Sequence, residues 1–159
     1  MATTRTEQQQ PQEWTPELET HWKDPKWWAQ GTAEEHLALD DLFDKHINED
    51  FKLSDWVEPK ANQEMWFVAS AGNLIKKTVR GYDFGDHVYF MVNPETESES
   101  RVRGERIWAN PADAMIFKLR QFASEMRERT TITNPAARDS QRMAFRIMLR
   151  FMFQQLESL

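Results

Sequence analysis

The spacing of hydrophobic residues changes twice along the chain, from a helical period to a strand-like one and back. Residues 14–50 combine apolar positions at helical spacing with a second face of acidic residues. Residues 64–92 are rich in β-branched and aromatic residues and are interrupted by glycines, which is typical of strands joined by turns. Helical spacing returns over residues 110–157. This order predicts an α+β fold in which helices flank a small antiparallel sheet.

Capping residues mark where the N-terminal helices begin. Thr15-Pro16 and Asp24-Pro25 each place a side-chain acceptor before a proline that suits the first helical position. Thr32 and Glu35 form a capping-box pattern, which opens a further helix that we expect to end near Asn48. Two or three acidic helices are therefore predicted over residues 14–50.

The same signals predict a helical hairpin at the C-terminus. Asn110-Pro111 and Asn134-Pro135 are matching helix starts, each with asparagine as the cap and proline at the first position. The short connection "TTITN" favours two helices that pack side by side over residues 110–157.

The middle of the chain predicts a three- to four-stranded antiparallel meander. Three strands are expected over residues 64–92, in "EMWFVAS", "NLIKKTVRGY" and "DHVYFMVN". We interpret "GYDFGD" as a hairpin turn, because it lacks the Lys-Ser/Thr pair of a phosphate-binding loop. Residues 93–104 are polar and charged and are expected to form an exposed loop, and "ERIWA" after them is a candidate edge strand.

Length and composition predict one domain behind a polar tail. The chain has 159 residues and is 40% hydrophobic, which suits a single core over residues 14–159. Residues 1–13 are polar and lack periodicity, so we expect a flexible tail. There is no cysteine, no apolar run of the roughly 18 residues that span a bilayer, and no signal-peptide pattern. We therefore expect no membrane partner and a cytoplasmic location, meaning the host cytoplasm or the virion for a viral protein.

Charge is distributed unevenly along the chain. Residues 1–60 hold 14 acidic and 6 basic residues, whereas residues 109–159 hold 5 acidic and 8 basic residues. The basic end contains four arginines at four-residue spacing, which we call the arginine ladder: Arg138, Arg142, Arg146 and Arg150. The N-terminal helices carry an acidic face: Glu34, Glu35, Asp40, Asp41 and Asp44.

The ladder has two functional interpretations. It can pair with carboxylates, either on the acidic face of its own chain or on another protein chain. Alternatively, it can bind nucleic acid phosphates, helped by Lys76, Lys77 and Arg80, although the net charge of −6 disfavours a polyanion. We favour the protein carboxylates. Because the last helix is apolar nearly all round, we also expect it to be buried or to lie in an oligomer interface.

Tryptophans concentrate near the N-terminus. Trp22, Trp27 and Trp28 are candidate anchors for a protein partner, since large aromatic side chains dominate interface energetics. The alternative is that they pack within their own chain.

No pattern of residues predicts catalysis or a resident cofactor. His36, Asp40 and Asp44 share a helical face that could hold a metal ion, but a solvated acidic face is the commoner outcome, and no metal site is predicted. The serines Ser54, Ser70 and Ser124 lack a nucleophile motif. We therefore predict no catalytic residues and no cofactor.

Acidic helices followed by a small meander and a helical hairpin resemble, in general layout, the small acidic assembly chaperones and structural adaptors of phages and secretion systems. The resemblance implies a viral structural or accessory role. We accordingly expect a non-catalytic assembly or adaptor protein that self-associates and binds a protein partner. A nucleic-acid-binding protein is the alternative, and a small-ligand protein or enzyme is the second alternative.

Overall fold

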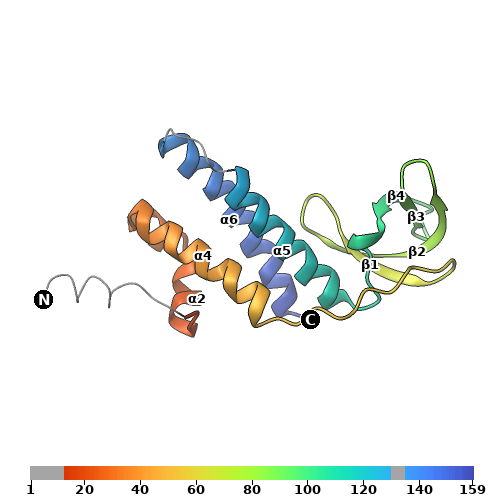
Figure 1. The fold of residues 1–159 in the computed structure, drawn as a ribbon, viewed down its shortest axis with the longest axis horizontal. Coiled ribbons are helices and arrows are strands. Elements are labelled where there is room, and N and C mark those ends of the chain that lie inside the picture. The colour runs from red at the N-terminus through yellow and green to blue at the C-terminus, as the bar shows by residue number, and fades with distance from the viewer. Residues whose placement is uncertain (1–12, 130–134) are drawn as a thin grey trace, which may run out of the picture. The chain divides into compact units, whose positions relative to one another are not determined.

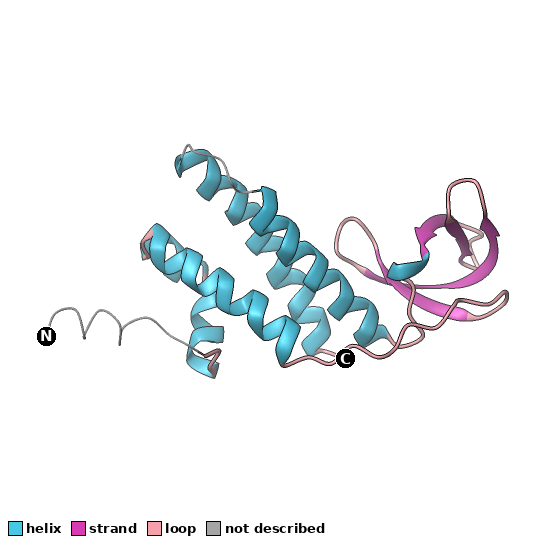
Figure 2. Ribbon diagram, viewed as in Figure 1, coloured by secondary structure: helices cyan, strands magenta, loops and turns pink. Residues whose placement is uncertain are grey.

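The computed structural model describes residues 13–129 and 135–159, in two compact units that divide between Lys52 and Leu53. The predicted α+β class is confirmed, since helices accompany a four-stranded antiparallel sheet (Figures 1 and 2). We expected one domain over residues 14–159, whereas the contacts group into a helical N-terminal unit and a larger C-terminal unit. The tail predicted over residues 1–13 lies, apart from Glu13, outside the described residues.

The described part of the N-terminal unit, residues 13–52, contains three helices that begin where their caps predict. They are α2 (Pro16–Lys23), α3 (Pro25–Gln30) and α4 (Ala33–Glu49). The Thr15 hydroxyl oxygen accepts a hydrogen bond from the amide of Leu18 at 3.2 Å, and Thr32 accepts one from Glu35 at 3.2 Å. Local side-chain chemistry therefore fixes the starts of these helices.

Aromatic stacking forms the interior of the N-terminal unit. The rings of Trp22 and Phe43 stack with centroids 4.2 Å apart, and Trp14 meets both of them edge-on. The indole Nε1 of Trp28 donates a 2.7 Å hydrogen bond to the carbonyl oxygen of Trp22. These contacts join α2 to α4 through Trp22 and Phe43, and α3 to α2 through Trp28 and Trp22.

The C-terminal unit is built on a sheet with strand order β1-β2-β3-β4, all neighbours antiparallel. The strands are β1 (Glu64–Val68), β2 (Leu74–Asp83), β3 (Val88–Val92) and β4 (Glu99–Arg103). The prediction of an exposed loop over residues 93–104 is wrong for residues 99–103, which form β4. Only Val102 of that strand is buried, so the polar edge strand shows almost no hydrophobic alternation in the sequence.

The chain after β4 returns to β1. A single 3-10 turn, η1 (Gly104–Arg106), is followed by Trp108, which pairs with Trp66 through two backbone hydrogen bonds of 2.7 and 2.8 Å. The candidate edge strand in "ERIWA" is therefore reduced to one bridge. Its effect is to bring the segment after β4 against the outer edge of β1.

One face of the sheet forms a buried core, and the C-terminal helices complete the unit. The core residues are Met65, Phe67, Val79, Tyr89, Met91, Val102 and Ile107. Helix α5 (Pro111–Arg129) lies against β1, and α6 (Pro135–Glu157) packs along α5, as predicted for a helical hairpin (Figure 1). The Asn110 side chain caps α5 by accepting from the Ala112 amide at 2.9 Å, whereas the predicted cap at Asn134 lies outside the described residues.

Candidate functional site

An extended segment, residues 53–63, crosses the C-terminal unit before β1 and is fixed at both ends. The amide of Ser54 donates to the carboxylate of the buried Asp113 at 3.2 Å. At the other end, the amide of Asn62 donates to the carbonyl oxygen of Val79 at 2.8 Å. These bonds hold the middle of the segment beside the sheet.

Trp56, in the middle of that segment, lies against η1. Its indole Nε1 donates a 2.8 Å hydrogen bond to the carbonyl oxygen of Gly104. A Cβ atom on Gly104 would come within 3.1 Å of the Tyr89 ring and 3.3 Å of the Trp56 ring. Glycine is therefore the residue that lets both rings approach the backbone at this point.

The turn between β2 and β3 supplies a second wall. Asp83 Oδ1 accepts hydrogen bonds from the amides of Gly85 at 2.8 Å and Asp86 at 3.3 Å, and Arg101 pairs with the carboxylates of Asp83 and Asp86 at 2.8 and 2.7 Å. The hydrogen bond from Gly85, more than the neighbouring Arg101, lowers the pKa of Asp83. This network fixes the turn that presents Phe84.

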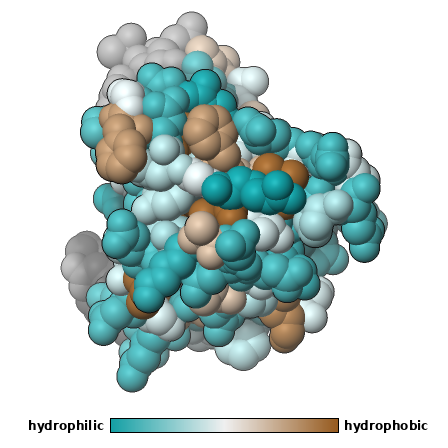
Figure 3. Space-filling model, turned by 90° about the vertical axis from the view of Figure 1, so that its right-hand side faces the viewer, coloured by the Kyte–Doolittle hydropathy of each residue, from teal (hydrophilic) through white to brown (hydrophobic). Residues whose placement is uncertain are grey.

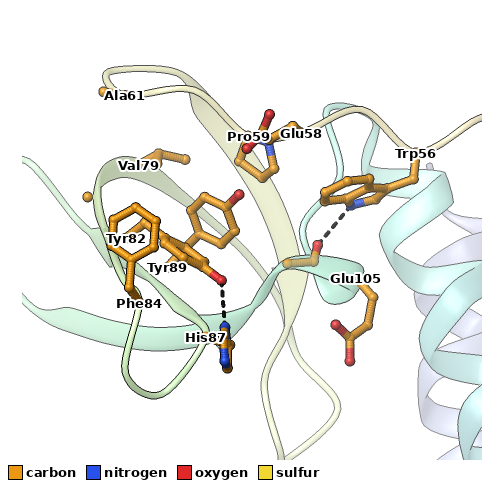
Figure 4. A pocket seen from close by; sticks show the side chains of 12 residues that line it. Trp56, Glu58, Pro59, Ala61, Val79, Tyr82, Phe84, His87, Tyr89 and Glu105 are labelled. Atoms are coloured by element: carbon orange, nitrogen blue, oxygen red, sulfur yellow. Dashed lines mark hydrogen bonds between the residues drawn. The ribbon is translucent and has the colours of Figure 1, made fainter.

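Between these two walls is an open pocket of about 880 Å³, which we call the aromatic pocket. Figure 4 shows Trp56 and Glu105 on one side and Tyr82 and Phe84 on the other. Its lining comes from residues 53–63, β2, the β2–β3 turn, β3 and η1, through Trp56, Glu58, Pro59, Ala61, Val79, Gly81, Tyr82, Phe84, His87, Tyr89, Gly104 and Glu105. Both tyrosines of the chain are among them.

The charge of the pocket is negative. Its described lining contains two carboxylates, Glu58 and Glu105, and no lysine or arginine. Burial raises the pKa of the Tyr89 hydroxyl, and the negative charge of Glu58 raises it further. His87 directs its Nδ1 at the hydroxyl oxygen of Tyr82, 3.2 Å away (Figure 4). The arrangement suits an apolar or cationic group.

The arginine ladder does not form an evenly exposed stripe. Arg142 and Arg146 are only 8% and 2% exposed, and Arg138 and Arg150 are half-buried. Arg150 donates from Nε to the carbonyl oxygen of Arg146 at 3.4 Å. The pairing of this ladder with carboxylates stays a prediction.

The residues of the predicted acidic face also differ in their exposure to solvent. Asp40 is 1% exposed and Asp44 is half-buried, whereas Glu34, Glu35 and Asp41 are exposed. Over residues 13–129 and 135–159, no cluster of three or more histidine or carboxylate side chains could hold a metal ion.

The His36 ring instead lies against tryptophans, with centroids 4.6 Å from Trp28 and 5.4 Å from Trp27. Of the tryptophans predicted as partner anchors, Trp22 and Trp28 are 0% and 2% exposed, and Trp27 is half-buried. Trp22 and Trp28 are therefore buried, and the role of the three tryptophans as partner anchors stays a prediction.

The sequence did not reveal the aromatic pocket, because its lining residues come from three separate stretches of the chain, residues 56–61, 79–89 and 104–105. The only local signal was the glycine-bounded turn "GYDFGD", which holds Tyr82 and Phe84. Within the described ranges, every helix is too short or too polar to cross a membrane. The chain matches no family model, no curated protein and no solved structure.

Proposed function

We propose that the protein is a non-catalytic adaptor that binds a segment of a partner protein in the aromatic pocket of its C-terminal unit. The observation that supports this is the convergence of Trp56, Tyr82, Phe84 and Tyr89 on one hollow. Tryptophan and tyrosine are among the residues that contribute most to protein–protein binding, because they bury a large area at little entropic cost.

The openness of the pocket favours a protein segment over an enclosed small molecule. Trp56 is 44% exposed and Phe84 is 82% exposed, so the walls themselves remain in contact with water. Small-molecule sites usually bury most of their ligand, which requires walls that close around it. A side chain that projects from a bound peptide would cover these two rings and remove their apolar surface from water.

Selection of binding peptides tests this function. We expect a random displayed library to yield peptides whose affinity falls about tenfold with Phe84→Ala, the loss of one strong interface contact. Because Phe84 is 82% exposed, this substitution should leave the fold intact. Leu159→Ala is the matched control, since Leu159 is also an exposed apolar residue, at 58%, but lies outside the aromatic pocket. Peptides that bind Phe84→Ala as well as they bind the native protein, or no peptides at all, would refute the proposal.

Self-association is a second candidate function, favoured by the outer face of α6. Ile147 and Phe151, four residues apart on that helix, are 57% and 44% exposed. Such neighbouring apolar side chains suit contact with a second copy of the chain. The nucleic-acid alternative has less support, since Arg142 and Arg146 offer little accessible surface to phosphates.

A further inference from the structure

The rings of the aromatic pocket present faces in different directions. Tyr82 and Phe84 meet edge-to-face, with centroids 4.9 Å apart and an interplanar angle of 86°. Tyr82 and Tyr89 lie 4.7 Å apart with an angle of 58°. On the opposite wall, Trp56 is held by its hydrogen bond to Gly104 (Figure 4). A group between these walls would meet aromatic faces, which carry partial negative charge.

The carboxylates strengthen this preference for positive charge. Glu58 and Glu105 are both exposed residues of the lining, and the influence of Glu58 reaches the phenol of the buried Tyr89. The guanidinium of Arg101 on β4 is engaged by the carboxylates of Asp83 and Asp86 on the β2–β3 turn. The described lining therefore contains two carboxylates and no lysine or arginine.

The hydration of the cation decides which side chain fits best. An unmodified lysine ammonium is compact and strongly hydrated, so bringing it against aromatic rings costs much of its hydration energy. A guanidinium is planar and weakly hydrated and stacks on aromatic faces, and methylated ammonium groups are bound in the same way by aromatic side chains.

We propose that the aromatic pocket binds a weakly hydrated cationic side chain of a partner peptide, arginine or methylated lysine, with Glu58 and Glu105 as counter-charges. The cation lies between Trp56 and the pair Tyr82 and Phe84. This inference rests on the proposed function, and it specifies the chemistry that the pocket selects. Figure 3 shows a largely hydrophilic face with separate hydrophobic areas. Charge complementarity contributes to the specificity of a contact between proteins.

A peptide series that differs at one central residue tests the inference on the full chain. The probes are acetylated glycine–serine peptides carrying arginine, trimethyllysine, lysine, citrulline or norleucine. The readout is the NMR shift of the Trp56 indole N–H, assigned with Trp56→Phe, and of the Gly104 amide. We expect saturable shifts with arginine and trimethyllysine, weaker binding of lysine, and no saturation with the neutral citrulline and norleucine.

Charge variants provide the matched control. Glu58→Gln and Glu105→Gln should each weaken arginine-peptide binding about fivefold, the effect expected for one partly exposed charge pair. Glu95→Gln changes the net charge equally but lies in the β3–β4 turn, outside the pocket, and should have no effect. Equal binding of citrulline and arginine, or equal weakening by Glu95→Gln, would overturn the inference.

The two proposals fail in distinguishable ways. If selected peptides depend on Phe84 but contain no cationic residue, the cation preference is wrong and the protein-binding function stands. If the selection yields no peptides that depend on the pocket, the proposed function is wrong. If, in addition, no probe shifts the signals of Trp56 or Gly104, the cation preference is wrong as well.

Discussion

At Gly72 the turn between β1 and β2 reaches the C-terminal end of α6. Gly72 has a φ of +92°, and its carbonyl oxygen accepts a 2.8 Å hydrogen bond from Nε2 of Gln155. The Oε1 of the same glutamine accepts a 3.1 Å bond from the amide of Leu74. The Gln155 side chain on α6 thus forms hydrogen bonds with the backbone at two positions of the turn, Gly72 and Leu74, and links α6 to the sheet.

We expect Gly72→Ala to lower the free energy of unfolding by about 2 kcal/mol, since a side chain is strained at positive φ. The added Cβ would also lie 2.8 Å from Sδ of Met148, which must move. For a chain of this length that loss corresponds to a fall in Tm of about 4–8 °C, measurable by calorimetry.

Gly81→Ala is the control for this substitution, because a Cβ there meets nothing closer than 3.9 Å and its φ is not positive. Equal Tm values for the Gly72→Ala and Gly81→Ala variants would contradict the argument.

At the scale of single elements, the stability that the β2–β3 turn contributes to the fold should decrease at acid pH. The pKa of Asp83 is lowered in the folded protein from its ordinary value of 3.8. Its contribution to stability is therefore present above that value and is lost as the pH falls through the lower, folded-state pKa. We expect the free energy of unfolding of the native protein, measured with urea, to fall as the pH is lowered through this range. The Asp83→Asn variant should show a smaller fall.

Asp55→Asn is the comparison, since Asp55 is an exposed carboxylate outside this turn. A pH profile of Asp83→Asn that matches those of the native protein and Asp55→Asn would contradict the assignment. The same turn presents Phe84, so peptide binding should also weaken at acid pH.

Elements with local signals could be predicted from the sequence, and elements assembled at long range could not. The starts at Pro16, Pro25 and Pro111 follow from caps within three residues. By contrast, β4 is defined by pairing with β3, and its one buried residue leaves no alternation to detect. The aromatic pocket is the extreme case, because the residues that face each other in it, such as Trp56 and Tyr82, belong to different segments.

Over the whole molecule, charge and hydrophobic exposure make different contributions to assembly. The first 60 residues carry a net charge of −8 and the last 51 carry +3, an asymmetry that favours association through opposite charges. Such association weakens as salt screens the charges. Contact through Ile147 and Phe151 is apolar and does not weaken in this way. The salt dependence of the native mass therefore distinguishes the two modes.

We expect light scattering to give a native mass above the 18.9 kDa of one chain at about 50 mM salt. Replacing both Ile147 and Phe151 by serine should lower the native mass to that of one chain. The double substitution removes the exposed apolar pair and changes no buried residue. Glutamate at Arg142 and Arg146 would be a poorer test, because a buried charge reversal disturbs folding as well as assembly. Val57→Ser is the control, since Val57 is 66% exposed and lies outside α6. A single-chain mass for the native protein at both low and high salt would contradict self-association and leave the aromatic pocket as the proposed contact with a foreign partner.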